Sequence, residues 1–399
     1  MELESLPEGW EIRSLGEVTN IIKGKKPKTI VNQKMEGYVP YILIESFNKV
    51  YSKFTNELSC PQCNRDDIIM VMDGASSGLI AIGLEGVIGS TLAAIKPKGM
   101  IDSDYLFYWL KSKYKILNKR ISGSTIPHVD KNLLKSLKFP IPPLEEQKKI
   151  VEILQFADYL KERRREAIKL IDKIVISVFY DMFGDPATNP KGWEVKKLGD
   201  IVQDVRYGIT RTVNKKEQGV PVLRVTDINN NGSINSNRIL NADLTEEEIE
   251  KYRLKPGDIL IARSGATAGK CGIYDGTPEI AAFASYIIKI TLDKSIVLPK
   301  FLHTFLNLGE GKRELLSGKG GSAQPNINSK SIKSIIIPLP PLDLQQEFAE
   351  IVSKLEDKRK KMEEAEEKLE MLYQILLKQA FTGKLTEEWR MRGKASKCR

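Results

Sequence analysis

The sequence predicts an α+β protein with two pseudo-symmetric mixed α/β domains joined by two long antiparallel coiled-coil helices. Three observations support this fold class. Motifs recur about 190 residues apart, two segments of 39 residues lack both proline and glycine, and each of these segments follows a Pro-Pro pair. A period of this length is too long for a solenoid unit, so the repeat is a duplicated domain. The chain of 399 residues is long enough to build several domains with cores of their own.

Short motifs at both ends of each copy define the repeat. Gly-Trp-Glu at residues 9–11 returns at 192–194, and Pro-Pro-Leu at 142–144 returns at 340–342. Between these motifs the offset drifts from 181 to 198 residues, which indicates insertions in the loops of the second copy. A protein with two similar but divergent copies of one domain usually contacts two similar but different partners.

The motifs divide the chain into five segments. These are a first globular domain at 1–139, a long helix at 140–184, a second globular domain at 185–337, a second long helix at 338–383, and a tail at 384–399. By pseudo-symmetry we expect the tail to lie near the N-terminus. Runs of β-branched residues and amphipathic stretches predict the main elements of the domains. They are strands at 38–44, 68–72, 220–228 and 259–262 and helices at 103–119 and 299–308.

Positions that alternate by three and four residues predict a coiled-coil seam on each long helix. In the first helix they are Ile150, Ile153, Ala157, Leu160, Arg164, Ala167, Ile171, Ile174 and Val178. Adding 198 gives Phe348, Ile351, Leu355, Lys358, Met362, Ala365, Leu369, Leu372 and Leu376. Further apolar residues beside the first seam widen its stripe, namely Val151, Leu154, Ile168, Val175 and Phe179.

The ends and middles of the two helices carry further signals. Gly184 and Gly383 end them, and the preceding prolines fix the chain where each helix begins. Basic clusters at 163–165 and 358–361 form either a solvated face or a contact with DNA phosphates.

The distribution of charge predicts a polyanionic partner. Residues 145–183 carry eight basic and eight acidic side chains, and residues 343–381 carry seven and ten. The long helices therefore contribute −3 to a net charge of +10, and the rest of the chain carries +13. This excess favours nucleic acid as the partner. No apolar run approaches a membrane span, so no membrane partner is expected, and the four cysteines and acidic N-terminus favour the cytoplasm.

Several signals for catalysis and cofactors are incomplete. The segment from Gly265 to Lys270 resembles a phosphate-binding loop, but its glycines are too close together and Cys271 replaces the residue that would hold magnesium. Cys60 and Cys63 have the spacing of a metal knuckle without a second pair. We expect no metal site, no cofactor and no catalytic residue.

The motifs together resemble those of the specificity subunit of type I restriction–modification systems. The resemblance covers essentially the whole chain. It rests on the sequence motifs at 179–186, 220–224, 257–262, 318–326 and 337–342, together with the Gln-Gln pair at 345–346. The first copy departs from the family pattern, since Arg-Asp-Asp at 65–67 replaces the usual Pro-Gly-Asp.

This resemblance implies a non-catalytic subunit that reads DNA. Each globular domain would be a target recognition domain for one half of a split site in double-stranded DNA. The helices would hold the two domains apart and dock two methyltransferase (modification) subunits, and a restriction/translocase subunit would complete the complex.

Polar and basic loop residues are the candidates for contact with DNA, because arginine can pair with guanine and amide side chains with adenine. They are Lys23, Lys25, Lys26, Lys28, Ser124 and His128 in the first copy. In the second copy they are Tyr207, Arg211, Lys215, Arg263, Ser264, Gln324 and Asn326. Two alternatives remain at this point: a nucleotide-dependent enzyme that uses the loop from Gly265 to Lys270, and a coiled-coil scaffold that binds only proteins.

Overall fold

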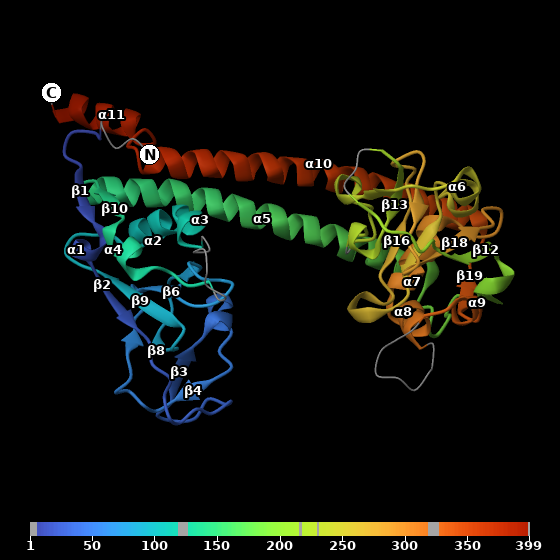
Figure 1. Ribbon diagram of the computed structural model, residues 1–399, viewed down its shortest axis with the longest axis horizontal. Helices are drawn as coiled ribbons and strands as arrows, with labels where there is room; N and C mark the ends of the chain where they lie inside the picture. The colour runs from blue at the N-terminus through green and yellow to red at the C-terminus, as the bar shows by residue number, and fades with distance from the viewer. Residues whose placement is uncertain (1–5, 119–126, 215–217, 230, 318–326, 398–399) are drawn as a thin grey trace. The chain divides into compact units, whose positions relative to one another are not determined.

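The computed structural model describes residues 6–118, 127–214, 218–229, 231–317 and 327–397 (Figure 1). It confirms the predicted fold class, with two mixed-sheet domains joined by the long helices α5 (Leu144–Phe183) and α10 (Leu342–Ala380). The chain forms two compact units, Met1–Arg164 with Ala365–Arg399 and Arg165–Glu364. Each unit therefore contains one globular domain, part of α5 and part of α10.

The first domain contains two four-stranded sheets. Sheet one has the order β2-β9-β6-β7, with bounds Thr19–Lys23, Leu92–Pro97, Ile68–Val71 and Ile80–Ala81. Sheet two has the order β4-β3-β8-β5, with bounds Phe54–Thr55, Val39–Ile42, Gly86–Ile88 and Gln62–Cys63. The helices are α1 (Leu15–Val18), η1 (Ile44–Asn48), α2 (Ser103–Ser112), α3 (Tyr114–Leu117) and α4 (Lys131–Ser136).

The second domain repeats this topology with one strand fewer in its smaller sheet. Its larger sheet has the order β12-β18-β15-β16, with bounds Val202–Tyr207, Ile287–Leu292, Ile259–Ala262 and Cys271–Ile273. The smaller sheet has the order β14-β13-β17, with bounds Leu240–Ala242, Val220–Leu223 and Ala282–Phe283. The helices are η2 (Leu198–Asp200), η3 (Val225–Asp227), η4 (Ser236–Arg238), α6 (Glu246–Tyr252), η5 (Gly265–Thr267), α7 (Pro299–Asn307), α8 (Gly309–Leu316) and α9 (Ser329–Lys333).

A two-stranded antiparallel ladder connects each domain to a long helix. The strand that follows the first Gly-Trp, β1 (Glu11–Ser14), pairs with β10 (Lys138–Ile141). In the second unit β11 (Glu194–Lys197) pairs with β19 (Ile336–Leu339). The last strand of each ladder leads directly into the Pro-Pro pair, and the long helix begins after that pair. The strands next to the two repeated motifs of each copy are therefore hydrogen-bonded partners.

A buried glutamine fixes the start of each long helix in the same way. Gln147 Oε1 accepts the backbone N–H of Asp102 at 2.8 Å, and its Nε2 donates to the carbonyl of Pro142 at 2.9 Å. Gln345, 198 residues later, accepts from Leu298 N–H at 2.9 Å and donates to Pro340 O at 2.9 Å. Each amide satisfies backbone groups that would otherwise be buried without partners.

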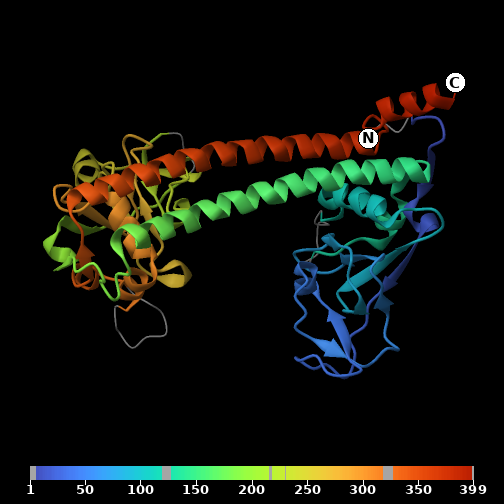
Figure 2. The same cartoon turned by 180° about the vertical axis from the view of Figure 1, so that it is seen from behind.

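The long helices pack antiparallel within each unit, and Figure 2 shows the pair from behind. Aromatic and aliphatic side chains from both helices join the core of each unit. Phe179 of α5 packs edge-on against Phe348 of α10 at 5.6 Å between ring centroids, in the second unit. Tyr373 and Phe381 lie in the core of the first unit with Ile150 and Leu154.

The predicted seam is wrong at every second position. On α5 the helix buries Leu154 and Lys161, whereas the predicted Leu160 is 41% exposed and Ile174 is 45% exposed. On α10 Val352 and Tyr373 are buried, whereas the predicted Leu372 is 56% exposed. Apolar residues stand at both of two adjacent positions, such as Ile153 and Leu154, so the spacing alone does not select one. Contact with the globular domain as well as with the other helix selects the second of each pair.

Two pseudo-symmetric ion pairs lie between the helices. In the first unit Lys161 Nζ lies 2.6 Å from Glu370 Oε2, and in the second Arg359 Nη1 lies 2.8 Å from Asp172 Oδ1. Lys161 and Arg359 are 198 residues apart, as are Asp172 and Glu370. Lys161 also lies 3.9 Å above the ring of Tyr373, which compensates part of the cost of its burial. The seam charges are thus Lys161 and Arg359 rather than the predicted Arg164 and Lys358.

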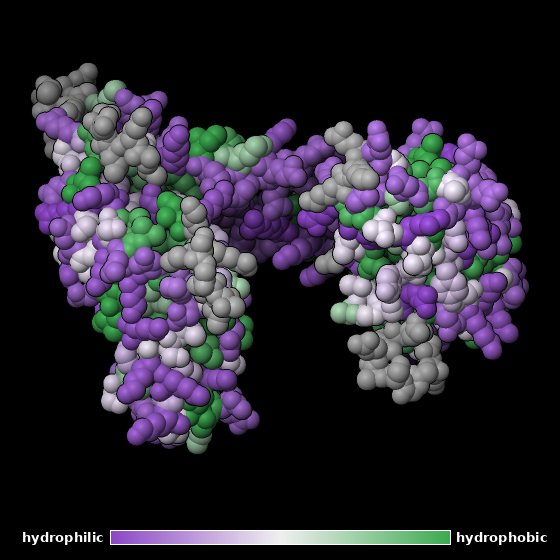
Figure 3. All heavy atoms as spheres, viewed as in Figure 1, coloured by the Kyte–Doolittle hydropathy of each residue, from purple (hydrophilic) through white to green (hydrophobic). Residues whose placement is uncertain are grey.

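Large apolar side chains remain exposed on the helices. In the first unit they are Phe156 (62%), Tyr159 (52%), Leu160 (41%), Met371 (61%), Leu372 (56%) and Ile375 (52%). In the second unit they are Leu170 (52%), Ile174 (45%), Ile176 (41%), Tyr180 (37%) and Leu342 (37%). Figure 3 shows hydrophobic side chains at the surface of the helix pair beside the first domain. We call the six exposed residues of the first unit the exposed helix patch. Among the described residues no helix is long and apolar enough to cross a membrane.

Other sequence-predicted elements are shorter than expected. The strand predicted at 38–44 ends at Ile42, and the strand predicted at 220–228 ends at Leu223, because the 3-10 turns η1 and η3 follow. The helix predicted at 103–119 is interrupted at Lys113 between α2 and α3. The strand at 259–262 agrees with β15.

Candidate nucleic-acid interface

Four segments of the first domain meet where strands β2 and β6 end, and backbone hydrogen bonds hold them together. Met72 N–H donates to Thr91 O at 2.8 Å, and Val129 N–H donates to Met72 O at 2.8 Å. Gly24 N–H donates to Leu92 O at 2.9 Å. We call this arrangement the sheet-end frame.

The second domain builds the same frame at the ends of β12 and β15. Arg263 N–H donates to Tyr286 O at 3.0 Å, and Ile327 N–H donates to Arg263 O at 2.8 Å. Gly208 N–H donates to Ile287 O at 3.2 Å. The three hydrogen bonds match those of the first domain one for one, so Arg263 occupies the place of Met72 and Tyr286 the place of Thr91.

A glycine is required at the same point of each frame. A Cβ on Gly24 would lie 2.2 Å from the carbonyl oxygen of Gly89. A Cβ on Gly208 would lie 2.3 Å from the carbonyl oxygen of Ala284. Both distances are far inside van der Waals contact, so any side chain would collide with the backbone that follows β8 in the first domain or β17 in the second. The frame is thus fixed by close backbone approach in both copies.

The side chains on the first frame are charged. Lys23 at the end of β2 pairs with Asp73, with Nζ 3.0 Å from Oδ2, and both side chains are partly exposed. His128 forms an antiparallel bridge with Asp73 and its side chain is exposed. The structure therefore pairs the side chain of the sequence-predicted Lys23 with Asp73 and places the sequence-predicted His128 opposite Asp73 in the backbone bridge.

The side chains on the second frame are aromatic and cationic. The guanidinium carbon of Arg263 lies 4.9 Å from the ring centroid of Tyr207. The Tyr207 hydroxyl accepts the backbone N–H of Ser329 at 3.0 Å. Tyr286 is 67% exposed, and Ser264 is partly buried beside Arg263. The frame thus combines the predicted residues Tyr207, Arg263 and Ser264.

The other predicted residues lie elsewhere or outside the described residues. Lys25, Lys26 and Lys28 are exposed on the loop after β2. Arg211 forms an ion pair with Glu248 of α6, and the backbone of Thr245 together with Arg211 lowers the pKa of that carboxyl. Four predicted residues lie outside the described residues, namely Ser124, Lys215, Gln324 and Asn326.

Sequence reasoning missed four members of the two frames. They are Met72, Asp73, Thr91 and Tyr286. Asp73 and Ser264 follow equivalent strands at an offset of 191, so the repeat itself could have identified Asp73 once Ser264 was chosen. Tyr286 precedes a buried strand, and an exposed aromatic there carries no local sequence signal.

The loop from Gly265 to Lys270 is a closed turn. The amides of Ala268, Gly269 and Lys270 donate to carbonyls of Gly265, Ala262 and Thr267, at 3.1, 2.8 and 3.0 Å. In the first domain Ser77, Gly78 and Leu79 make the same three bonds to Gly74, Val71 and Ser76. These amides are used inside the turn and do not point at a common ligand, as a phosphate loop requires.

The two cysteines of the knuckle motif belong to the core of the smaller sheet. Cys60 and Cys63 are 8% and 5% exposed, and Cys63 Sγ donates to the carbonyl of Gly86 at 3.5 Å. Burial raises the pKa of the Cys63 thiol to about 11, so it stays protonated at neutral pH. Among the residues that the structure describes, no group of three or more His, Cys, Asp or Glu side chains could hold a metal ion.

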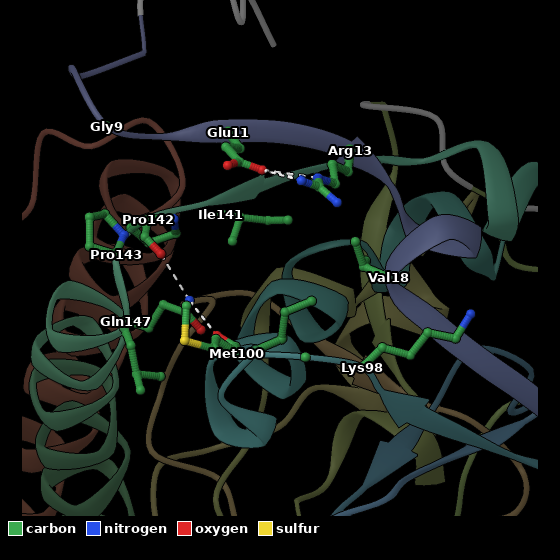
Figure 4. A pocket seen from close by; sticks show the side chains of 13 residues that line it. Gly9, Glu11, Arg13, Val18, Lys98, Met100, Ile141, Pro142, Pro143 and Gln147 are labelled. Carbon is green, nitrogen blue, oxygen red and sulfur yellow. Dashed lines mark hydrogen bonds and ion pairs between the residues drawn. The ribbon is translucent and has the colours of Figure 1, made fainter.

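A cleft of about 300 Å³ lies beside the ladder of the first domain (Figure 4). Glu11 and Arg13 on its wall pair with each other, with Arg13 Nη2 2.7 Å from Glu11 Oε2. Gln147 is occupied by its backbone partners. The cleft therefore offers no pair of groups arranged for acid–base or nucleophilic catalysis.

Comparison with known families identifies similar proteins along nearly the whole chain. The family model for the type I restriction modification DNA specificity domain matches residues 7–170 and 190–371. The type I restriction enzyme MjaVIII specificity subunit of Methanocaldococcus jannaschii is 32% identical over 408 residues, covering 95% of this chain and 94% of the relative. The EcoKI specificity subunit of Escherichia coli is 25% identical over 431 residues, covering 98% and 92%.

Solved structures with low sequence identity share the fold. The S subunit of a type I restriction–modification system from M. genitalium superposes with a TM-score of 0.54 at 18% identity, covering 95% of this chain and 97% of that one. A chain from a structural study of complex assembly and conformational transition of the type I R-M system gives a TM-score of 0.59 at 19% identity, covering 96% and 100%.

Proposed function

Because this chain belongs to the family of type I restriction–modification DNA specificity subunits, we propose that each of its domains reads one half of a bipartite DNA target. Members of this family are the non-catalytic components of restriction–modification complexes. The sheet-end frame is the observation that carries the proposal. The two domains share its backbone hydrogen bonds but present different side chains on it.

The chemistry of each frame suits a different contact with DNA. Arg263 can donate two hydrogen bonds to one guanine, and the exposed ring of Tyr286 can pack on a sugar or a base. Lys23, His128 and Asp73 present one acceptor and several donors. A carboxylate can accept from the amino group of cytosine, while a lysine can bind a phosphate or a guanine. Two domains with these different sets would read two different half-sites.

Exposed lysines and the overall charge support the approach to DNA. Lys25, Lys26 and Lys28 extend the positive surface beyond the first frame. The part of the chain outside the long helices carries +13, which attracts a polyanion before any base is read.

We further propose that the helices dock methyltransferase (modification) subunits and that a restriction/translocase subunit completes the complex. The exposed helix patch supports docking, because six large apolar side chains between 41% and 62% exposed are unusual on a charged helix pair. A protein partner that covers them would gain the free energy of burying apolar surface.

The alternatives left by the sequence receive less support. A nucleotide-dependent enzyme would need the amides of the loop after Gly265 for phosphate, and three of them, those of Ala268, Gly269 and Lys270, are engaged inside a turn. A scaffold that binds only proteins would leave the differing side chains on the two frames without a role.

Reconstitution tests this function. The purified chain should bind DNA with an affinity that falls steeply as salt rises, and it should transfer no methyl group by itself. Methyl transfer should appear only when a methyltransferase subunit is added. Methylation by the purified chain alone, or salt-independent binding, would overturn the proposal.

A charged residue placed in the exposed helix patch tests whether the methyltransferase subunit docks there. Leu372→Lys should abolish co-purification with the methyltransferase subunit, since it places a charge among exposed apolar side chains. Gln374→Lys, also exposed on α10, is the matched control and should leave the complex intact. Equal co-purification of both variants would show that the patch is not the docking surface.

A further inference from the structure

The side chain of Arg263 has one buried nitrogen for which the described residues provide no acceptor. Its Nε is buried, and among the residues that the structure describes no atom accepts a hydrogen bond from it. The neighbouring backbone is fully used, since Arg263 N–H donates to Tyr286 O and its carbonyl accepts from Ile327 N–H. A buried cationic donor without an acceptor is costly, and such groups in native structures require an explanation.

The fold does not require an arginine at this place. Met72 occupies the equivalent position of the first frame and is 2% exposed. A methionine there costs no desolvation of charge and packs as an ordinary core residue. The arginine in the second domain therefore has a role other than stabilising the frame.

Tyr207 orients the guanidinium. The ring lies 4.9 Å from the guanidinium carbon, and its hydroxyl is fixed by the backbone N–H of Ser329 at 3.0 Å. A planar guanidinium held over a fixed ring loses little conformational freedom when it binds a planar partner. The site is thus arranged before any ligand arrives.

We propose that Arg263 reads a guanine in the half-site of the second domain, with Tyr207 as the platform that holds the guanidinium in the plane of the base. This inference rests on the proposed function and adds to it the identity of one base. Guanine presents the acceptors O6 and N7 side by side in the major groove, which matches two parallel N–H groups of one arginine. The first domain has no counterpart, because Met72 cannot donate a hydrogen bond.

The first test changes one atom of the DNA. The methylated motif is determined by sequencing the DNA of cells that carry the chain with its methyltransferase subunit. The assembled complex is then bound to duplexes in which each guanine of the second half-site is replaced in turn by 7-deazaguanine, which lacks only the N7 acceptor. One of these replacements should weaken binding roughly tenfold or more.

Variants of the chain complete the test. In Arg263→Met, which copies the first domain, the complex should no longer distinguish guanine from 7-deazaguanine at that position and should accept other base pairs there. Arg263→Lys keeps the charge and should lose most of the discrimination as well. Tyr207→Leu should weaken discrimination in part, and Tyr207→Phe should weaken it less. Arg392→Met removes one charge from an exposed residue of the first unit, and it should change nothing at this base pair.

The outcomes separate this inference from the function on which it rests. Wild-type complex without any sequence preference would overturn both. A second half-site without a G·C pair, or one in which no 7-deazaguanine weakens the wild type, would overturn the guanine contact alone. Arg263→Met that lowers affinity equally for all sequences would assign Arg263 to phosphate. The 7-deazaguanine series needs only the wild-type chain, so it decides the question even where a variant fails to fold.

Discussion

The first and second domains share the sheet-end frame, the sheet order and the glutamine at the start of each long helix, but they differ in the side chains on that frame. Met72 and Lys23 in the first correspond to Arg263 and Tyr207 in the second. The shared parts are backbone hydrogen bonds and buried glutamines, which fix geometry. The differing parts are side chains, among them the buried Met72 and the exposed Lys23, and side chains can change without disturbing the backbone geometry. A duplicated scaffold can therefore acquire two specificities, because function resides in the site and not in the fold.

The units also differ in the hydrogen-bond partner of the tryptophan that precedes the first ladder strand. In the second unit Trp193 Nε1 donates to the carbonyl of Phe183 at 2.8 Å, ten residues earlier in the same chain segment. In the first unit Trp10 Nε1 donates to Glu146 at 3.0 Å, and Glu146 also accepts from Thr386 and pairs with Arg390. The position equivalent to Glu146 is a leucine in the second unit. Where segments far apart in sequence must meet, a buried carboxylate joins them.

The largest effect should follow from removing this carboxylate. Glu146→Ala removes the buried carboxylate that pairs with Arg390 and that accepts from Trp10 and Thr386, and we expect a loss of roughly 3–5 kcal/mol in the free energy of unfolding. Urea denaturation measures it. Glu145→Ala, next in sequence but exposed and paired only with Lys148, is the control and should change stability little. Equal losses in the two variants would show that the Glu146 contacts do not hold the first unit together.

The two buried glutamines should behave alike. Gln147→Ala and Gln345→Ala each remove the partner of one backbone N–H and two carbonyls, so each should cost about 1–3 kcal/mol. The exposed neighbour Gln346→Ala should cost almost nothing. Denaturant unfolding of the three variants checks the pseudo-symmetry directly. A large cost for one buried glutamine and none for the other would contradict it.

Acid should destabilise the second domain through His303. Burial, assisted by Lys300 and Lys312, lowers the pKa of His303 to about 4 from a usual 6.5. Below about pH 6.5 the unfolded chain binds a proton that the folded domain does not, so stability is lost as pH falls from 6.5 towards 4. The loss at pH 5 should be about 2 kcal/mol. His303→Gln keeps a donor for Cys271 O but cannot titrate, and it should remove this part of the pH dependence. An unchanged pH profile in that variant would refute the assignment.

The smallest change should come from lengthening one helix. Four residues duplicated near Ala167 add about 6 Å and about 40° of rotation to α5. The unread spacer of the DNA target should grow by about one or two base pairs, and both half-sites should stay the same because the frames are untouched. Activity should fall, since the region of α10 near Ala365 is not lengthened and the seam must bulge. A fully active complex with an unchanged spacer would show that the helices do not set the distance between the two half-sites.

The sequence predicted the large features because their signals are long and repeated. The segments without proline and glycine, 145–183 and 343–381, agree with α5 and α10 to within a residue at each end, whereas the predicted helix segments 140–184 and 338–383 begin about four residues too early. The predicted seam was wrong because Ile153 and Leu154 are equally apolar. Contact with the globular domain, in addition to the other helix, decides which of the two is buried.

Functional residues were predictable only where their chemistry shows in the sequence. Lys23, Tyr207, Arg263 and Ser264 were identified because they are polar or basic residues close to the ends of predicted strands. Met72 was missed because a buried methionine looks like any other core residue in the sequence, although it occupies the position equivalent to Arg263. The role of such a residue becomes visible only when matching hydrogen bonds align it with the arginine of the other copy.

Replacement of residues 193–335 by the corresponding domain of another family member tests the central claim most directly. The methylated motif of cells that carry the hybrid chain and the methyltransferase subunit is read by sequencing. If the two frames read DNA independently, one half of the motif should change to that of the donor protein and the other half should stay the same. A hybrid in which both halves change, or neither, would contradict the account.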